Sequence, residues 1–571
     1  MKFFTLVVAI AMTLPSFAQE QENKPLAIED EGLTQYLNSR KVPQLTVKVI
    51  NSKTPVQGKE VKYSTVHLGA EMQTKNFTQL NSDGEVKIAL TENLPYQQVW
   101  LNIDGLYYTG VLVNDGLEII IDAGKTEKAA YIYGDNISFK GADAGLNHTI
   151  CRHLLYKKGE REKLMGKLVD ISINAANRKL DQEPFLQMAD SIYIALLQID
   201  AEFFKENATY QWAVKNETSS SFYEWFVVGI KRSKDTPEGT YRNLMDHKPY
   251  FMSNSGAGFY RNLSSYLANK KDDKGPDIQK LLYASNKEMT PAQKEVLDSI
   301  NYYEGLANEN EKTSLNKLYS QRYKLFKKEI DKIYCQSAIR SIESNADVTK
   351  ADILKLSLME RWKDDFSAIY PLIGNTMKKG WAKSFLQQQM NESTARQNEI
   401  NKLFSSADKL TGDQHYIGNS VANLSFGAQL YTLDSIDNID NFIVNLKSKF
   451  KGKALVIDIW ATWCGPCIAD ITNSKVLHEE AKDLPIAYIY LCTTNGSDIE
   501  TWKTRIGTLK PPGTHIFMDE KLENAFRKKL NAEGGYPTYV VIDQKGNIGT
   551  DKISFMTELN KEALKKKTGI E

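Results

Sequence analysis

The sequence predicts a multidomain protein with an N-terminal antiparallel β-sandwich, a central all-α region and a C-terminal α/β domain. Three observations lead to this prediction. Apolar residues alternate with polar ones over residues 44–140, recur at helical spacing over residues 141–411, and form alternating strand-like and helix-like runs over residues 412–571. A chain of 571 residues is also too long for one hydrophobic core, so we expect these three segments to be separate domains.

Residues 1–18 follow the pattern of a secretory signal peptide. Lys2 gives the amino end a positive charge, Phe3 to Leu14 is apolar, and Ser16-Phe17-Ala18 offers small residues where a signal peptidase cleaves. The apolar run is too short for a permanent membrane helix, and no later apolar run reaches the ~18 residues that one needs. A buried N-terminal helix is the alternative. We expect an exported, soluble protein of the periplasm, without stable membrane insertion after cleavage.

The mature chain has no pattern that points to a lipid anchor or to nucleic acid. The first cysteine is Cys151, far beyond the predicted cleavage site, so a lipoprotein is not expected. The 72 Lys and Arg residues balance 71 Asp and Glu residues, which gives no basic surface for a nucleic acid. Residues 19–43 are polar and contain prolines, and we interpret them as a leader into the first domain.

The β-sandwich prediction rests on short alternating runs such as Leu45-Thr46-Val47-Lys48-Val49, separated by turn sequences such as Ser82-Asp83-Gly84 and Asn114-Asp115-Gly116. Turns at intervals of about 8 to 12 residues are typical of small antiparallel sandwiches.

Two helix starts stand out in the central region. Thr290-Pro291-Ala292-Gln293 combines a hydroxyl N-cap, a first-turn proline and a capping-box glutamine, and Thr349-Lys350-Ala351-Asp352 offers a second hydroxyl cap. Apolar residues follow the second start at steps of four, and an aromatic cluster occupies residues 222–226; both are more often core than binding site. The stripe consists of Leu354, Leu358, Trp362, Phe366 and Tyr370. His153, His247 and His415 lack metal-ligand spacing, so we expect them to be structural.

The C-terminal segment alternates predicted strands and helices. The predicted strands cover residues 453–460, 486–491, 515–518 and 537–543, and a hairpin is expected at residues 544–547. The predicted helices cover residues 465–482, a stretch opened by residues 495–497, and the end of the chain from Thr557. Alternation of this kind predicts a mixed sheet covered by helices.

Cys464-Gly465-Pro466-Cys467 joins the first of these strands to the helix that follows. At a helix N-terminus, unpaired N–H groups and the positive end of the dipole stabilise a thiolate, so Cys464 is the expected attacking thiol. Cys467, one turn later, is within reach to close a disulfide. A zinc site is the alternative, but no second Cys or His pair has matching spacing, and no metal is expected. The other cysteines, Cys151, Cys335 and Cys492, are expected to be free.

The stretch Asp458-x-Trp460-Ala461-x-Trp463-Cys464-Gly465-Pro466-Cys467 resembles the active site of the thioredoxin superfamily, and Gly535-Tyr536-Pro537-Thr538 resembles that family's cis-proline loop. The resemblance covers the last part of the chain and implies a thioredoxin-like fold. It implies that Cys464 attacks a substrate disulfide, that Cys467 resolves the mixed disulfide, and that Asp458 is a buried proton relay of raised pKa. Trp463, Tyr536 and Pro537 would then bind substrate, with Pro537, if cis, placing the Tyr536 backbone beside the sulfurs.

The segment between Cys467 and Pro537 is longer than a minimal thioredoxin needs, which predicts an inserted strand and helix around residues 508–530. Together with the export signal, this is similar to the TlpA-like oxidoreductases, and the domain layout resembles exported thioredoxin-like proteins of Bacteroidetes. Asp458 departs from that subfamily, because many of its members carry a neutral residue there.

The resemblance implies an extracytoplasmic thiol-disulfide oxidoreductase that needs no cofactor and reduces disulfides of exported proteins, with a membrane partner as electron donor. Two alternatives stay open at this point. One is a thiol peroxidase of the peroxiredoxin type, although Thr462 is two rather than three positions before Cys464. The other is a binding protein whose N-terminal domains carry the main role, with an accessory redox domain.

Overall fold

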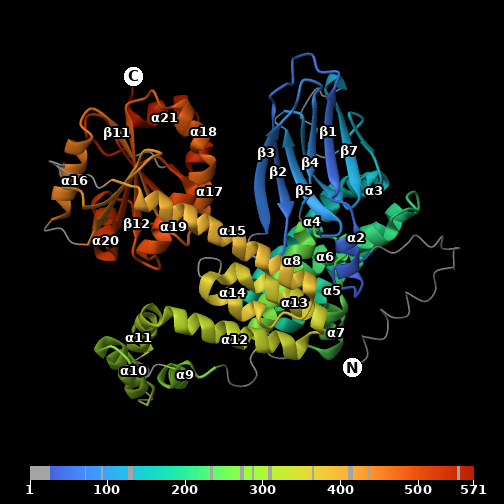
Figure 1. Ribbon diagram of the computed structural model, residues 1–571, viewed down its shortest axis with the longest axis horizontal. Helices are drawn as coiled ribbons and strands as arrows, with labels where there is room; N and C mark the ends of the chain where they lie inside the picture. Colours follow the sequence, from blue (N-terminus) through green and yellow to red (C-terminus); the bar gives the residue numbers. More distant parts are fainter. Residues whose placement is uncertain are drawn as a thin grey trace. The chain divides into compact units, whose positions relative to one another are not determined.

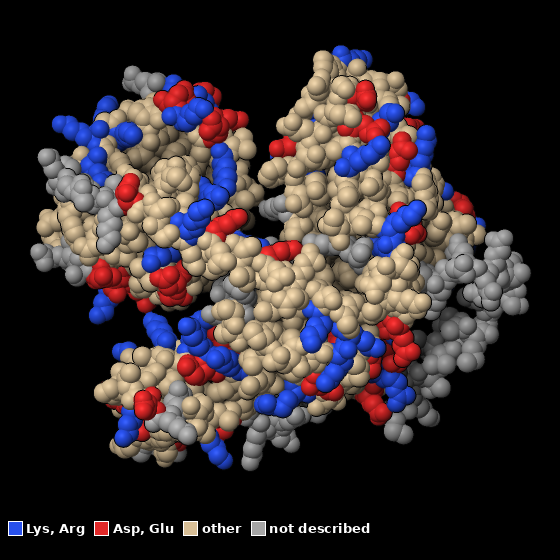
Figure 2. All heavy atoms as spheres, in the orientation of Figure 1, with Lys and Arg blue, Asp and Glu red and all other residues tan. Residues whose placement is uncertain are grey.

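The computed structural model describes residues 26–570 apart from positions 71, 92–93, 104, 126–132, 232–235, 271–275, 286–287, 306–311, 363–365, 409–415, 435–437 and 550–552 (Figure 1). The predicted signal peptide and His415 lie outside these residues. Contacts divide the chain into two compact units, which meet in sequence at Met390 and Asn391. Lys and Arg residues are intermixed with Asp and Glu residues on the face that Figure 2 shows, in keeping with the balanced composition.

The first unit opens with a β-rich part of two four-stranded sheets, ordered β4-β1-β7-β8 and β3-β2-β5-β6. Their strands are β1 (Gln44–Ile50), β2 (Glu60–Val66), β3 (Gln73–Gln79), β4 (Glu85–Ala89), β5 (Gln97–Ile103), β6 (Tyr107–Val113), β7 (Gly116–Asp122) and β8 (Ile137–Lys140). Alternate side chains of both sheets form one apolar core, which includes Val47, Leu101 and Ile119. The period-two pattern therefore predicted a β-rich region correctly.

The prediction of wholly antiparallel pairing is wrong at one place. β1 and β7 pair in parallel, with Gln44 opposite Gly116 and Ile50 opposite Asp122. The alternation of apolar and polar residues shows which face of a strand is buried, but it carries no information on the direction of the neighbouring strand. Parallel neighbours need a long crossover, and here the chain passes through the second sheet between β1 and β7.

Helices form the rest of the first unit. They are α2 (Leu33–Ser39), α3 (Ala144–Leu155), α4 (Lys158–Ala176), α5 (Gln182–Phe204), α6 (Gln211–Ile230), α7 (Glu238–Asp246), α8 (Asn254–Asn269), α9 (Ile278–Ser285), α10 (Pro291–Glu304), α11 (Lys312–Leu325), α12 (Lys327–Asn345), α13 (Val348–Leu358), α14 (Phe366–Gly374) and the start of α15 (Gly380–Ser405). Val66 and Leu68 from the β-rich part share the helical core. Leu33 in the predicted leader is also buried there, so this segment packs rather than only leading into the sheet.

The capping box at Thr290 is confirmed, because its hydroxyl accepts the N–H of Gln293 and the Gln293 side chain accepts the N–H of Thr290. The start at Thr349 is wrong by two residues. Asp347 caps α13, because its carboxylate accepts two N–H groups, from Thr349 and Lys350. The apolar stripe is not one helix either: α13 ends at Leu358 and a 3-10 turn follows over Met359–Trp362.

The described members of that stripe are nevertheless core residues, as predicted: Leu354, Leu358, Trp362 and Tyr370 are buried. In the aromatic cluster, Phe222 and Phe226 are buried and stacked on each other. Of the three histidines predicted to be structural, the two that the structure describes have hydrogen-bond partners. His153 lies 2.7 Å from Asp200, and His247 lies 3.1 Å from the Ser220 hydroxyl.

The second unit contains one six-stranded sheet, ordered β14-β11-β12-β13-β10-β9. Its elements are β9 (Asn419–Leu424), β10 (Ala428–Leu433), α16 (Ile439–Lys449), β11 (Ala454–Trp460), α17 (Gly465–Asn473), α18 (Lys475–Glu480), β12 (Ile486–Thr493), α19 (Ile499–Leu509), β13 (Gly513–Met518), α20 (Glu520–Lys529), β14 (Thr538–Ile542), a 3-10 turn (Met556–Glu558) and α21 (Lys561–Thr568). The outermost strands, β14 and β9, are antiparallel to their neighbours, and the inner pairs are parallel.

Helices cover both faces of this sheet. Leu455, Ile457 and Ile459 of β11 face a core that includes residues of α16 and α20. The alternate β11 residues face the other side, where α17, α18, α19 and α21 contribute apolar side chains. This second face carries Asp458, because side chains alternate along a strand. Among the described helices of both units, none is long and apolar enough to cross a membrane.

Candidate active site

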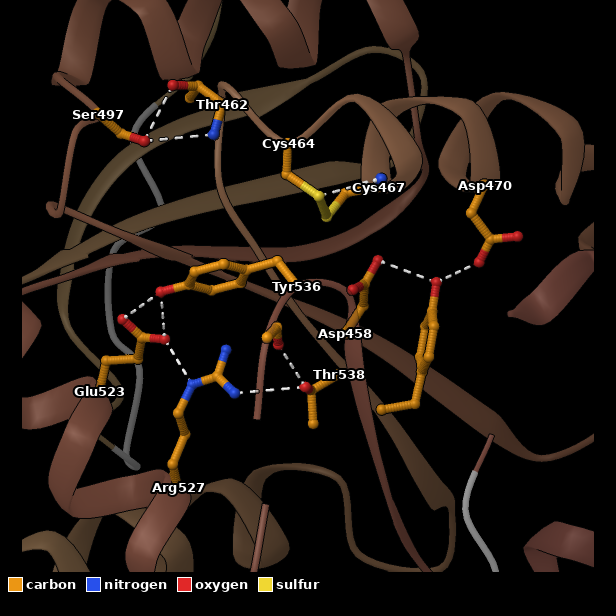
Figure 3. Close-up of a disulfide and its surroundings, with 12 residues drawn as sticks. Asp458, Thr462, Cys464, Cys467, Asp470, Ser497, Glu523, Arg527, Tyr536 and Thr538 are labelled. Atoms are coloured by element: carbon orange, nitrogen blue, oxygen red, sulfur yellow. Dashed lines mark hydrogen bonds and ion pairs between the residues drawn. A yellow bond between two sulfur atoms is a disulfide. The ribbon is translucent and has the colours of Figure 1, made fainter. Parts of the chain in front are cut away.

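Cys464 and Cys467 lie where the chain leaves β11 and enters α17, and a disulfide joins them (Figure 3). Cys464 is the N-cap of the helix, and its sulfur accepts the N–H of Cys467 at 3.2 Å. Pro466 fits in the first turn, because the N–H that it lacks has no partner within the helix. Cys464 is 4% exposed and Cys467 is fully buried, so of the two cysteines only the first reaches the surface.

A hydrogen-bonded loop fixes the residues just before Cys464. Both the N–H and the hydroxyl of Thr462 are bonded to Ser497 Oγ, at 3.2 and 2.9 Å. The Trp463 indole donates to the carbonyl of Asn495 at 2.8 Å, although the side chain is 55% exposed. Gly496 has a φ of +68°, and a Cβ there would lie 2.7 Å from the indole nitrogen. A glycine is therefore required at position 496 for the Trp463 indole to keep this position.

Asp458 lies in the middle of β11, in a strand whose residues are all buried. In the sheet it is directly opposite Tyr490 on one side and Tyr539 on the other. Burial raises the pKa of Asp458 well above its usual range, and the negative charge of Asp470 raises it further. The expectation that Asp458 is buried is thus confirmed.

Asp470 is a second buried acid, on α17 one turn after Cys467. It accepts the N–H groups of Met556 and Thr557 at 2.8 and 3.0 Å, and the Thr557 hydroxyl at 2.8 Å. The Tyr539 hydroxyl also donates to Asp470, and it lies 3.5 Å from Asp458. Because a phenol has one proton, the contact with Asp458 is a hydrogen bond only when Asp458 is itself protonated.

A small cavity adjoins Asp458. It is lined by Val456, Asp458, Ile471, Ser474, His478, Tyr488, Tyr490, Tyr539 and Met556. The volume accessible to the centre of a water molecule in this cavity is about 10 Å³, which is about what a cavity needs to hold one water. Burial lowers the pKa of His478 to about 4, so this ring is neutral near pH 7. The described residues that line this cavity are therefore partly polar, and none of them is a cation that would hold Asp458 ionised.

Tyr536 and Pro537 form the other wall of the site, between α20 and β14, and the peptide bond between them is cis. The Tyr536 ring meets the Trp463 ring edge to face, with 5.4 Å between the ring centres. The structure thus brings together Trp463, Cys464, Tyr536 and Pro537, which the sequence places in two distant segments; Figure 3 labels Cys464 and Tyr536.

Residues 437–565 match a family model described as Redoxin. The thioredoxin-like protein YneN of Bacillus subtilis (strain 168) is 28% identical over 112 residues, which make up 20% of this chain and 63% of that protein. This C-terminal part of the chain is therefore similar to proteins of the thioredoxin superfamily. Most of the chain lies outside each match, and the whole first unit lies outside the Redoxin match.

Two solved structures are similar to part of the chain. The thioredoxin domain of a thiol-disulfide oxidoreductase from Bacteroides vulgatus is 19% identical, covers 21% of this chain and 81% of its own, and has a TM-score of 0.19. A thiol:disulfide interchange protein from Chlorobium tepidum TLS is 21% identical, covers 22% and 83%, and has the same TM-score of 0.19.

Sequence reasoning missed Asp470 and Tyr539 in this C-terminal part of the chain. Asp470 follows Cys467 at a spacing of three, which puts both side chains on one helix face, and this was the available signal. The partnership of Tyr539 with both acids depends on strand register, which no local pattern showed. The cysteines outside the site, Cys151, Cys335 and Cys492, are free and buried, and burial raises the pKa of each thiol. Among the residues that the structure describes, no cluster of His, Cys, Asp and Glu has the arrangement of a metal site.

Proposed function

We propose that this protein is an extracytoplasmic thiol-disulfide oxidoreductase that reduces disulfides of exported proteins through Cys464 and Cys467. The observation that carries the proposal is the pairing of these cysteines at the N-terminus of α17, with Asp458 buried on the sheet face that this helix covers. The Redoxin match over residues 437–565 supports the same activity.

The reaction starts from the reduced dithiol. The Cys464 thiolate attacks one sulfur of the substrate disulfide, the substrate S–S bond breaks, and the first substrate sulfur leaves as a thiolate. Cys467 then loses its proton and attacks the Cys464 sulfur, which releases the second substrate thiolate and forms the Cys464–Cys467 disulfide. The structure holds this oxidised end state. A dithiol donor must return two electrons and two protons, and we propose a membrane-bound partner for this step.

Asp458 serves as the proton relay for Cys467 in this proposal. A carboxylate that burial disfavours is a stronger base than an exposed one, so it accepts a proton near neutral pH. Asp470 is held by four hydrogen bonds, which fixes α17 to the 3-10 turn at Met556–Glu558 and keeps a second charge near Asp458. In this proposal Asp458 transfers a proton, whereas Asp470 has a structural role.

Trp463, Tyr536 and Pro537 are the proposed substrate-binding residues. Trp463 has more than half of its side chain exposed beside the one cysteine that faces the surface. β13 and α20 form the proposed inserted strand and helix of a TlpA-like domain, and the two sheets of the first unit correspond to the proposed β-sandwich. The proposed compartment is the periplasm, on the strength of the signal-peptide pattern in residues 1–18.

Insulin reduction by dithiothreitol tests the proposal on the full mature chain. Wild-type protein should accelerate it, Cys464→Ser should abolish the acceleration, and Cys335→Ser, a matched change of a free buried cysteine in the first unit, should retain it. Cys467→Ala should accumulate mixed disulfides with its partners. Retained activity in Cys464→Ser would show that the dithiol is not catalytic.

A further inference from the structure

A buried ion pair lies on α20, away from the cysteines. Glu523 and Arg527 are one helical turn apart, their side chains are 2% and 6% exposed, and Arg527 Nε donates to Glu523 at 2.6 Å. Removing two charges from water is costly, and their mutual attraction offsets that cost only when further hydrogen bonds satisfy the remaining polar atoms. The other hydrogen-bond partners of Glu523 and Arg527 therefore indicate the role of the ion pair.

Arg527 is bonded to the loop that precedes β14. One terminal nitrogen of its guanidinium group donates to the carbonyls of Ala532 and Gly534, at 3.0 and 3.4 Å, and to the Thr538 hydroxyl at 3.3 Å. The Thr538 hydroxyl in turn donates to the Gly535 carbonyl at 2.7 Å. The loop that contains Tyr536 and Pro537 is thus bonded to one side chain before and after the cis bond.

Glu523 holds the side chain of Tyr536. The phenol lies 2.9 and 3.1 Å from the two carboxylate oxygens and donates to them, and the Arg527 guanidinium lies 4.7 Å from the centre of the same ring (Figure 3). Burial, together with Glu523, raises the pKa of Tyr536 to about 12, so the phenol keeps its proton at neutral pH. A hydrogen bond to a charged acceptor and a cation against the ring fix both ends of this side chain.

The fixed ring is the one that meets Trp463. Both aromatic side chains are reachable from solvent, whereas Glu523 and Arg527 are not. We propose that Glu523 and Arg527 are positioning residues, which hold Tyr536 against Trp463 so that the two rings form the surface that a polypeptide substrate contacts beside Cys464. This inference rests on the proposed oxidoreductase function and assigns it a preference for substrates whose disulfide carries flanking side chains.

The prediction that separates positioning from folding is a change in substrate preference. A polypeptide disulfide brings side chains that reach both rings, whereas a small aliphatic disulfide such as hydroxyethyl disulfide brings none. Tyr536→Phe removes one oxygen atom and leaves the ring, so it is the variant least prone to unfold. It should lower the ratio of kcat/KM for insulin to kcat/KM for hydroxyethyl disulfide by about 5- to 20-fold, with most of the loss in the KM for insulin.

Glu523→Gln is the second variant, since it keeps an acceptor for the phenol but removes the charge, and it should lower the ratio by less than Tyr536→Phe. The double variant should match Tyr536→Phe alone, because both changes act on one hydrogen bond. Lys529→Gln is the matched control, because Lys529 lies on the same helix in an exposed ion pair with Asp440. Its ratio should equal that of the wild type.

Three outcomes overturn the inference. An unchanged ratio in Tyr536→Phe, or equal losses on both substrates, would show that the clamp does not position a substrate surface. Strictly additive effects in the double variant would show that Glu523 does not act through Tyr536. A wild type that reduces insulin no better than Cys464→Ser would overturn the proposed function and this inference together. This result differs from the first two outcomes, in which the wild type is active.

Discussion

Replacing Asp458 by asparagine tests the proton relay most directly. The two side chains have nearly the same size, so the packing between Tyr490 and Tyr539 in the sheet is retained. Asparagine cannot exchange a proton with Cys467, while the helix terminus that activates Cys464 is untouched. We therefore expect attack by Cys464 to continue at close to the wild-type rate, and the resolving step to slow by about 10- to 100-fold.

The two steps can be followed separately by stopped flow with 5,5′-dithiobis(2-nitrobenzoate). The first thionitrobenzoate released reports attack by Cys464, and the second reports resolution by Cys467. Asp440→Asn, in an exposed ion pair, is the control and should leave both phases unchanged. Equal second-phase rates in Asp458→Asn and wild type between about pH 6 and 8 would refute the relay.

The same variant has a stability signature with a definite sign. The folded state holds the Asp458 proton to a higher pH than the unfolded state does, because burial raises the folded pKa. Above the unfolded pKa of about 3.9, rising pH therefore destabilises the wild type by up to about 1.4 kcal/mol per pH unit, until the folded pKa is passed. Asparagine does not titrate. The gap in unfolding free energy between Asp458→Asn and wild type should widen with pH over that range, measured by hydrogen exchange of β11 peptides, and a constant gap would contradict the burial argument.

Three further predictions follow from the same structure. Unfolded, oxidised mature protein should contain three free thiols, counted with a thiol reagent, and a count of one would reveal a second disulfide. Gly496→Ala should destabilise the C-terminal unit by about 1–2 kcal/mol, because a Cβ would strain the positive φ and press on the Trp463 indole; an unchanged urea midpoint for that unit would contradict this. Thr290→Ala should cost about 1 kcal/mol and speed amide exchange at the start of α10, and exchange at the wild-type rate would argue against the capping box.

The redox dithiol was predictable because its chemistry is local. The strand, the turn and the helix start are contiguous in sequence, and thiolate stabilisation needs only that junction. The burial of Asp458 was also readable, since it interrupts an apolar run. The cis-proline loop was predicted from a resemblance to a family. The side chains that support the loop were not predicted, because Glu523 and Arg527 have the spacing of an ordinary surface pair on a charged helix.

The features that sequence reasoning missed depend on contacts between distant segments. The parallel pairing of β1 with β7 joins strands at either end of the β-rich part. The helix start at Thr349 was misplaced because Asp347, two residues earlier, is itself a favourable N-cap residue and accepts the N–H groups of Thr349 and Lys350. Lys350 on this helix is itself buried, with its ammonium group bonded to the carbonyls of Met245 and His247, which no hydrophobic pattern could show.

The hydrogen-bond partners of Asp470 are synthesised after Asp470 itself. The cysteines and Asp458 are made first, Tyr539 follows, and Met556 and Thr557 come near the end of the chain. An emerging chain therefore exposes its two thiols before the groups that surround the buried acids exist. Because these long-range contacts form only after the last segment docks, a nascent chain carries both thiols before the surroundings of Asp458, the proposed proton relay, are complete.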